Sequence, residues 1–129
     1  MKVMEFKSPR DDVTFHIRED WWRFAEMDTF TPQNDCYPFR DSCDRPGKVK
    51  VVPIEQIEPP TRNEGVQPFC KCSLVPILLG FRNRFAELPP VSVKVLPQTD
   101  GYQYKVENGF HRYYASVAAG YTHLPVIVQ

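Results

Sequence analysis

The sequence predicts an α+β fold, in which one small mixed sheet packs against helices. Short runs at residues 48–54, 91–95 and 102–107 alternate β-branched or apolar side chains with polar ones, as half-buried strands do. Residues 73–85 repeat apolar side chains at helical spacing. A second helix is indicated by the alanine-bearing run at residues 111–119, which is followed by Gly120.

The first 47 residues are interpreted as an N-terminal extension that packs on a core domain of residues 48–129. Within the extension, residues 13–17 alternate like a short strand, and residues 18–27 suit a short helix. Residues 28–47 are rich in Asp, Pro, Asn, Arg and Cys without periodicity, which is typical of a loop.

Three aromatic residues of this extension, Trp21, Trp22 and Phe24, allow two interpretations. As structural residues they seal the extension onto the main body, and this interpretation is favoured. As functional residues they would stack on a base or a sugar, or present an exposed patch to a protein partner.

The core domain is predicted to open with the strand at residues 48–54. A short turn follows at Ile54–Ile57 and ends at Pro59-Pro60. In the helix over residues 73–85 the apolar stripe consists of Leu74, Ile77, Leu78, Phe81 and Phe85. We expect Ser73 to cap this helix and Pro76 to lie in its first turn, where proline is tolerated.

The second half of the core is predicted to contain a hairpin, a helix and a last strand. Strands 91–95 and 102–107 are separated by a turn cluster at residues 98–101, which favours a hairpin. The helix over residues 111–119 has a natural C-terminal glycine in Gly120. Residues 124–128, Leu-Pro-Val-Ile-Val, are predicted to form the final strand.

Composition restricts the classes of function. Sixteen basic and sixteen acidic residues cancel, so no global field attracts nucleic acid or a membrane, although a local basic patch stays compatible with this total. No run approaches the roughly 18 apolar residues of a membrane span, and the opening residues lack the apolar region of a signal peptide. We therefore expect a cytoplasmic protein without a membrane partner.

The four cysteines are Cys36, Cys43, Cys70 and Cys72, spaced as C-x6-C and C-x-C. Neither spacing matches the usual C-x2-C zinc pattern. Separate reduced thiols are the favoured interpretation, and a metal site or a redox pair is the alternative. No metal site is predicted.

The most informative stretch is residues 102–115, where a strand turns at Asn108-Gly109 directly into a helix that begins with His111 and Arg112. The N-terminus of a helix offers backbone N–H groups and a partial positive charge, which suit a phosphate. Gly109 would let the backbone approach a ligand, and the planar fork of Arg112 would bind phosphate oxygens. Asparagine suits the tight turn because it tolerates left-handed geometry.

The order of these elements resembles the ParB/sulfiredoxin superfamily. In that family a strand leads into a Gly-x-His-Arg turn, an alanine-bearing helix, a glycine and a strand of the form x-Pro-Val-x-Val. The matching segments are Gly109-Phe-His-Arg112, Gly120 and Leu124-Pro-Val-Ile-Val128, with Val52-Pro-Ile-Glu-Gln-Ile-Glu-Pro59 as the opening strand and turn. The resemblance extends over roughly residues 48–129.

This resemblance implies a nucleotide-binding protein, because family members bind nucleotide phosphates at the same turn. They include sulfiredoxins, free-serine kinases, partition proteins that bind CTP and DNA, and ParB-like nucleases. ATP or CTP with Mg²⁺ is therefore the expected ligand, held by Asn108, Gly109, His111 and Arg112, with Arg62 reaching the same pocket. If the protein is an enzyme, the resemblance favours phosphoryl transfer or nucleotide hydrolysis, with Glu58 as general base and His111 as acid or base.

The chain also departs from the family. Phe110 stands where a sulfiredoxin has its catalytic cysteine, which argues against sulfinic-acid repair unless Cys70 or Cys72 supplies the thiol. No helix-turn-helix segment follows the last strand, which argues against chromosome partition, and no acidic cluster near the turn supports a nuclease.

Two other functions stay open. One is a non-enzymatic DNA-associated or regulatory module with a basic edge of Arg62, Lys71, Arg82 and Arg84. The other is a protein that keeps the turn for structural reasons and binds a partner through Trp21 and Trp22. A homodimer is compatible with each of these functions.

Overall fold

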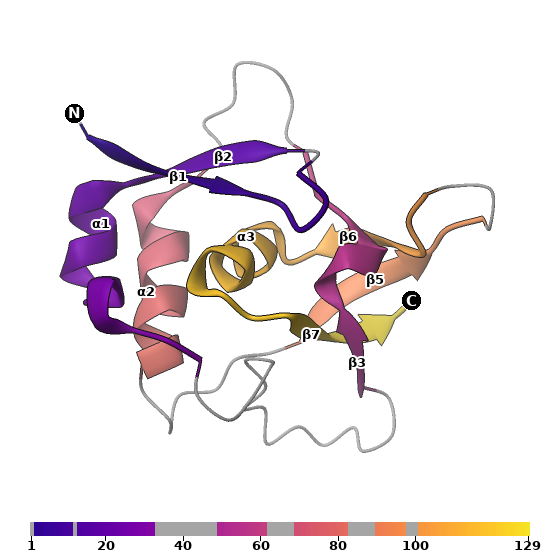
Figure 1. Ribbon diagram of the computed structural model, residues 1–129. Coiled ribbons are helices and arrows are strands. Elements are labelled where there is room, and N and C mark those ends of the chain that lie inside the picture. The colour runs from indigo at the N-terminus through magenta and orange to yellow at the C-terminus, as the bar shows by residue number, and fades with distance from the viewer. Residues whose placement is uncertain (1, 12, 33–48, 62–68, 83–89, 98–100) are drawn as a thin grey trace.

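The computed structural model describes residues 2–11, 13–32, 49–61, 69–82, 90–97 and 101–129. Within them the chain forms a two-stranded hairpin, a five-stranded sheet and three α-helices (Figure 1). The hairpin pairs β1 (Val3–Lys7) with β2 (Thr14–Arg18) in antiparallel register. The predicted α+β class is confirmed, and strand β1 and the second, smaller sheet were not predicted.

The five-stranded sheet has the order β3-β7-β5-β6-β4. Its strands are β3 (Val49–Pro53), β4 (Ile57–Glu58), β5 (Val91–Val95), β6 (Tyr104–Asn108) and β7 (His123–Val128). Pairs β5–β7 and β4–β6 are parallel, whereas β3–β7 and β5–β6 are antiparallel. The sheet is thus mixed, as predicted, and β5 and β6 form the predicted hairpin pair.

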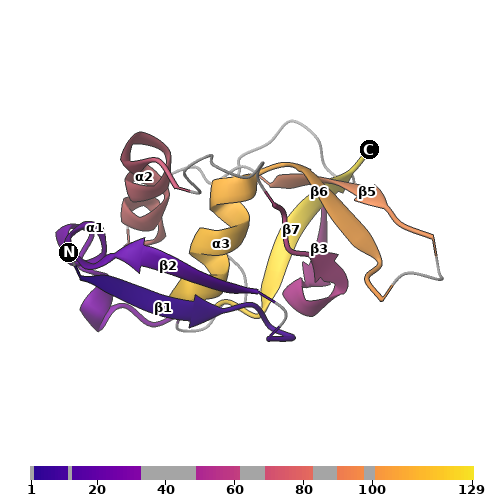
Figure 2. The same cartoon turned by 90° about the horizontal axis from the view of Figure 1, so that it is seen from above.

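Helix α3 (Phe110–Ala119) lies in the middle of the molecule, between the five-stranded sheet on one side and the hairpin and α2 (Lys71–Arg82) on the other (Figure 2). This position explains why its side chains are buried on more than one face, with Tyr113, Tyr114 and Ala115 all at most 3% exposed. Gly120 ends the helix in the left-handed conformation at φ 98°, as predicted.

The N-terminal segment joins the same hydrophobic core as the sheet. Phe15, Trp21 and Trp22 are at most 7% exposed and belong to one core cluster with residues of α2, α3 and the sheet. The two tryptophans, on α1 (Glu19–Phe24), are therefore core residues, so the exposed tryptophan patch of the partner-binding hypothesis is wrong. Phe24 is the exception, because its side chain is 64% exposed.

Two short 3₁₀ turns complete the described chain, at Met27–Thr29 and Ile54–Gln56. The first continues beyond α1 into the segment expected to be a loop. The second is the predicted turn after the first strand of the core. Its first residue, Ile54, and the residue after it, Ile57, are buried. The rest of the predicted loop, residues 33–47, lies outside the described residues, as do the turn residues 98–100.

Helix α2 begins earlier than predicted, which changes the roles of two residues. Because it starts at Lys71, Ser73 lies inside its first turn and is not the cap. Pro76 lies inside the helix rather than in the first turn. The apolar stripe was correct for Leu74, Leu78 and Phe81, which are at most 3% exposed. Phe85 lies outside the described residues.

The junction between β6 and α3 depends on Gly109, which precedes the first helical residue. Its φ of 129° is a conformation that side-chain-bearing residues rarely adopt. A Cβ at this position would lie 2.8 Å from Cγ1 of Val91, a residue of β5 that is 1% exposed. The glycine is therefore required by the packing of the turn against the sheet.

We predict that Gly109→Ala lowers the free energy of unfolding by about 2–4 kcal/mol, because it combines backbone strain with overpacking against Val91. The matched control is Gly101→Ala, since a Cβ there would meet its nearest neighbour, Nη1 of Arg10, at 3.6 Å. We expect this control to stay within about 0.5 kcal/mol of the wild type. Urea unfolding of the three proteins measures both changes, and equal losses would contradict the steric explanation.

Candidate functional site

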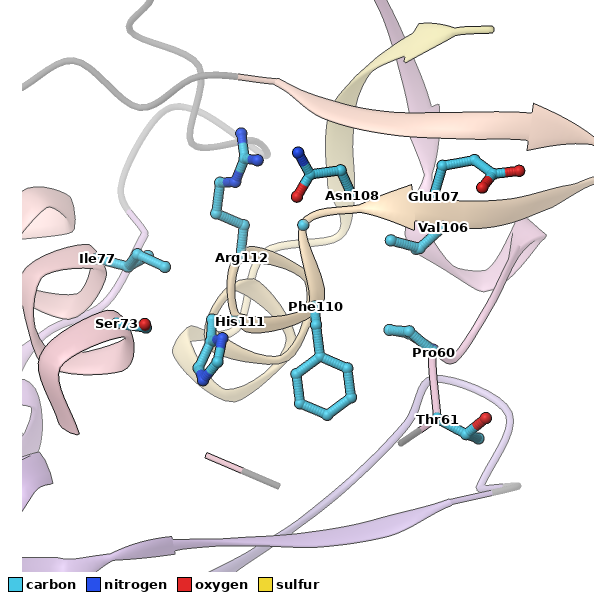
Figure 3. Close-up of a pocket in the computed structure, with 11 residues that line it drawn as sticks. Pro60, Thr61, Ser73, Ile77, Val106, Glu107, Asn108, Phe110, His111 and Arg112 are labelled. Carbon is cyan, nitrogen blue, oxygen red and sulfur yellow. The ribbon is translucent and has the colours of Figure 1, made fainter. Parts of the chain in front are cut away.

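A pocket of about 650 Å³ opens at the first turn of α3 (Figure 3). Four segments line it: the end of β6, the start of α3, one side of α2 and the chain after β4. The lining residues are Pro60, Thr61, Ser73, Ile77, Val106, Glu107, Asn108, Gly109, Phe110, His111 and Arg112. The pocket therefore coincides with the turn that sequence analysis had selected.

The first turn of α3 presents three different side chains to the pocket. Phe110, His111 and Arg112 extend from the turn in different directions, while Ser73 and Ile77 reach the pocket from α2 (Figure 3). The residue before the helix, Gly109, has no side chain of its own that could cap the N–H groups of this turn. The partial positive charge of the helix N-terminus thus faces the pocket.

Arg112 is held in place at the pocket by the backbone of the segment before β5. Its Nη1 donates a hydrogen bond to the carbonyl oxygen of Pro90 at 2.7 Å. The side chain is half-buried, and burial lowers the pKa of the guanidinium because a cation loses hydration there. The group stays charged at neutral pH, so the pocket contains a partly desolvated cation.

His111 connects the start of α3 to the start of α2. Its Nε2 accepts a hydrogen bond from the backbone N–H of Cys70 at 3.1 Å, so this ring nitrogen carries no proton in the structure. The ring lies edge-on to Phe69 and Phe110, with centroid distances of 5.9 and 5.5 Å. These contacts fix the orientation of the imidazole beside the pocket.

Tyr114, one turn further along α3, supports the wall that carries Pro60 and Thr61. Its hydroxyl donates to the carbonyl oxygen of Pro60 at 2.6 Å. The ring packs against Phe15, Phe69 and Phe110 at centroid distances of 4.7, 5.6 and 5.0 Å. Burial raises the pKa of Tyr114 to about 12.

The structure brings together four of the six residues that sequence analysis selected as site residues: Asn108, Gly109, His111 and Arg112 all line the pocket. Glu58 is not among the lining residues. It pairs with Lys105 of β6, the residue before Val106, and the part of β6 that lines the pocket begins at Val106. Arg62 lies outside the described residues.

Sequence analysis did not predict that Ile77, Pro60 and Thr61 line the pocket, and it favoured a capping role over a second anion site for Ser73. Ser73 and Ile77 lie one turn apart on α2 and so share the face that meets the pocket. The helical spacing of residues 74–81 predicted which face of this helix is apolar. It did not predict that the start of α3 lies across the pocket from that face. Glu107 was also missed, because it was read only as the end of a strand.

The basic edge expected for DNA binding is described only in part, because Arg62 and Arg84 lie outside the described residues. Arg82 pairs with Glu26 at 3.7 Å and also donates to the carbonyl oxygen of that residue at 2.8 Å. The ammonium group of Lys71 lies 5.7 Å from the ring centroid of Phe24. The charge of Arg82 is thus partly neutralised by an acidic neighbour.

The described cysteines, Cys70 and Cys72, are exposed thiols that form no disulfide. Cys36 and Cys43 lie outside the described residues. Among the residues that the structure describes, no group of three His, Cys, Asp or Glu side chains could hold a metal ion. None of the described helices is long and apolar enough to cross a membrane.

The sequence matches no protein-family model and no curated protein.

We predict that Tyr114→Phe lowers the free energy of unfolding by about 1 kcal/mol at pH 7, because the hydrogen bond to Pro60 is lost. In the wild type, the pKa of this tyrosine is about 10 in the unfolded chain and about 12 in the folded protein. Stability linked to Tyr114 is therefore complete below pH 10 and is lost between pH 10 and 12.

The variant lacks this linked loss, so the stability difference between the two proteins should shrink across that range. Urea unfolding of both proteins at pH 7, 9, 10, 11 and about 12 measures the difference. If the difference in free energy of unfolding stays constant above pH 10, burial does not shift the pKa of Tyr114.

Proposed function

We propose that this protein is a nucleotide-binding domain of the ParB/sulfiredoxin type, with ATP or CTP bound through its phosphates at the first turn of α3. The observation that carries this proposal is the pocket of about 650 Å³ in which Asn108, Gly109, His111 and Arg112 come together. Pockets of about 300–1,000 Å³ are the usual size for small-molecule ligands.

The charge distribution favours a phosphate at the helix end of the pocket. The N-terminus of α3 contributes a partial positive charge, and Arg112 contributes a full one from a half-buried position. A phosphate group beside Arg112 would offset the hydration that the guanidinium loses through burial. Both sources of charge belong to the first turn of α3, so one phosphate can interact with both.

The remaining lining residues suit the less polar part of a nucleotide. Ile77, Val106 and Phe110 supply apolar surface on three sides of the pocket, and Thr61 and Ser73 supply hydroxyl groups. A sugar or a base needs this combination of apolar contact and a few hydrogen-bonding groups. The pocket therefore has complementary regions for both parts of a nucleotide.

The expected Mg²⁺ would enter with the phosphates. Mg²⁺ in nucleotide sites keeps several waters and takes one or two carboxylates together with phosphate oxygens. Glu107 is the acidic residue among those lining the pocket, so it is the described side chain that would hold the ion. When bound, Mg²⁺ would neutralise charge on the phosphates.

If phosphoryl transfer or nucleotide hydrolysis accompanies binding, His111 is the pocket residue suited to act as acid or base. Its ring is oriented by the contact with Cys70 and lies on the first turn of α3. Glu58, the other expected catalytic residue, does not line the pocket, so a role for it as general base requires a rearrangement of β4.

We predict that ATP or CTP with Mg²⁺ binds with micromolar affinity and that Arg112→Gln weakens this binding by about 10- to 150-fold. The loss corresponds to about 1.5–3 kcal/mol, the usual worth of a charged hydrogen bond. Glutamine removes the charge but keeps an amide donor for the Pro90 carbonyl, so the fold is expected to survive. Isothermal titration calorimetry with each nucleotide measures the change.

The matched control is Arg23→Gln, because Arg23 lies on α1 in surface ion pairs with Glu19 and Asp28 and does not line the pocket. We expect its nucleotide affinity to equal that of the wild type. Equal affinity in Arg112→Gln, or no binding of either nucleotide to the wild type, would overturn the proposal.

A further inference from the structure

His111 is held at the pocket by a hydrogen bond that only its neutral form accepts. Its Nε2 accepts the backbone N–H of Cys70, the residue before α2, at 3.1 Å. A ring nitrogen that accepts an N–H has no proton, whereas the imidazolium form has an N–H on both nitrogens. Protonation of Nε2 would therefore bring two N–H groups face to face and break this hydrogen bond between the starts of α2 and α3.

The hydrogen bond from Cys70 to His111 joins two walls of the pocket. Ser73 and Ile77 line the pocket from α2, and His111 lines it from the first turn of α3 (Figure 3). Phe69, which is 5% exposed, lies between the described strands and α2 in the chain and has its ring centroid 5.9 Å from that of the imidazole. The way α2 meets α3 at the pocket thus includes a contact that depends on a titratable side chain.

The start of α2 contributes no competing proton acceptor through this contact, because a backbone N–H does not titrate near neutral pH. The titratable side chains there are the exposed thiols of Cys70 and Cys72 and the ammonium group of Lys71. That ammonium group lies 5.7 Å from the ring centroid of Phe24 on α1. The protonation state of the contact is therefore set on the side of the imidazole.

On the pocket side, a bound phosphate would favour the opposite charge state of His111. The charged side chains that share the pocket lining with it are Arg112, on the same helical turn, and Glu107, at the end of β6. A phosphate at this turn would add at least one anionic oxygen. An anion close to an imidazole favours its protonated form, and an imidazolium donates hydrogen bonds from both nitrogens. Cys70 and a phosphate thus favour different states of one ring.

We propose that His111 is a proton-controlled link: its neutral ring holds the start of α2 through Cys70, and phosphate binding places a proton on Nε2, which releases Cys70 and adds a second cation to the pocket beside Arg112. The proton comes from solvent, so the complex carries more protons than the free protein. This inference rests on the proposed nucleotide function and adds control of its affinity by pH. By linkage, the affinity rises as the pH falls through the range in which the imidazole titrates.

The link itself is tested without nucleotide, by ¹H–¹⁵N NMR spectra of the labelled full chain. At about pH 8 we expect the proton of the neutral His111 ring on Nδ1. As the pH falls to about 5, the amide proton of Cys70 should shift upfield in step with protonation of that ring. In His111→Gln the side-chain carbonyl can accept the same N–H at every pH, so this amide signal should stay constant. A wild-type Cys70 amide that does not follow His111 would overturn the proposal.

The exchange on binding is tested by calorimetric titration with ATP, CTP and inorganic triphosphate, each with Mg²⁺, at about pH 7.5 in buffers of different ionisation enthalpy. We expect the wild type to take up about 0.5–1 proton more than His111→Gln. Proton changes on the ligand are common to both proteins, so the difference isolates the imidazole. Between about pH 8.5 and about pH 6.5, the affinity of the wild type should rise about 10-fold more than that of His111→Gln.

The matched control is His123→Gln, because His123 begins β7, has its Nδ1 hydrogen-bonded to Oγ1 of Thr122 at 2.8 Å and does not line this pocket. It should keep the proton uptake of the wild type, and circular dichroism checks that both variants are folded. If the ligands bind and Arg112→Gln weakens them, but the wild type and His111→Gln take up equal numbers of protons, the phosphate site stands and the link is overturned. If none of the three ligands binds the wild type, the proposed function and the link both fall.

Discussion

The close contact between Gly109 and Val91 is the constraint on which the arrangement of the site depends. At this point the chain leaves β6, adopts a backbone conformation that favours glycine and starts α3 against the side chain of a buried β5 residue. The turn has no room for a Cβ, and the helix begins at the next residue, so its first turn lines the pocket. The same glycine that makes the turn suitable for phosphate is thus first required by the fold.

The aromatic residues of the N-terminal segment and of α3 form the second support of the pocket. Phe15 of β2 packs on Tyr114, which in turn packs on Phe69 and Phe110 and donates to the carbonyl oxygen of Pro60. Segments distant in the sequence therefore meet around one tyrosine. This explains why the N-terminal segment matters for the pocket, although none of the described pocket-lining residues comes from it.

The contacts of His111 connect the pocket to the start of α2. Its ring belongs to the first turn of α3, and its Nε2 accepts the N–H of Cys70 at the start of α2. Two helix N-termini are consequently adjacent in space, each with its own chemistry: a cation and a histidine on α3, and two thiols on α2. The hydrogen bond from Cys70 to His111 is one contact that connects them, so a change in the backbone of Cys70 reaches a residue that lines the pocket.

The sequence by itself determined the type of most described elements, because periods of two and of 3.6 residues separate strands from helices. Strands β1 and β4 and the 3₁₀ turn at Met27–Thr29 were not predicted. It also determined that Asn108, Gly109, His111 and Arg112 belong to one turn, since these residues are neighbours in the chain. Only the tertiary structure decided that Ser73, Ile77, Pro60 and Thr61 close the pocket and that Glu58 does not. Periodicity shows which face of an element is apolar, but it does not identify the element that packs against this face. The contact between Cys70 and His111, which are 41 residues apart, therefore could not be predicted.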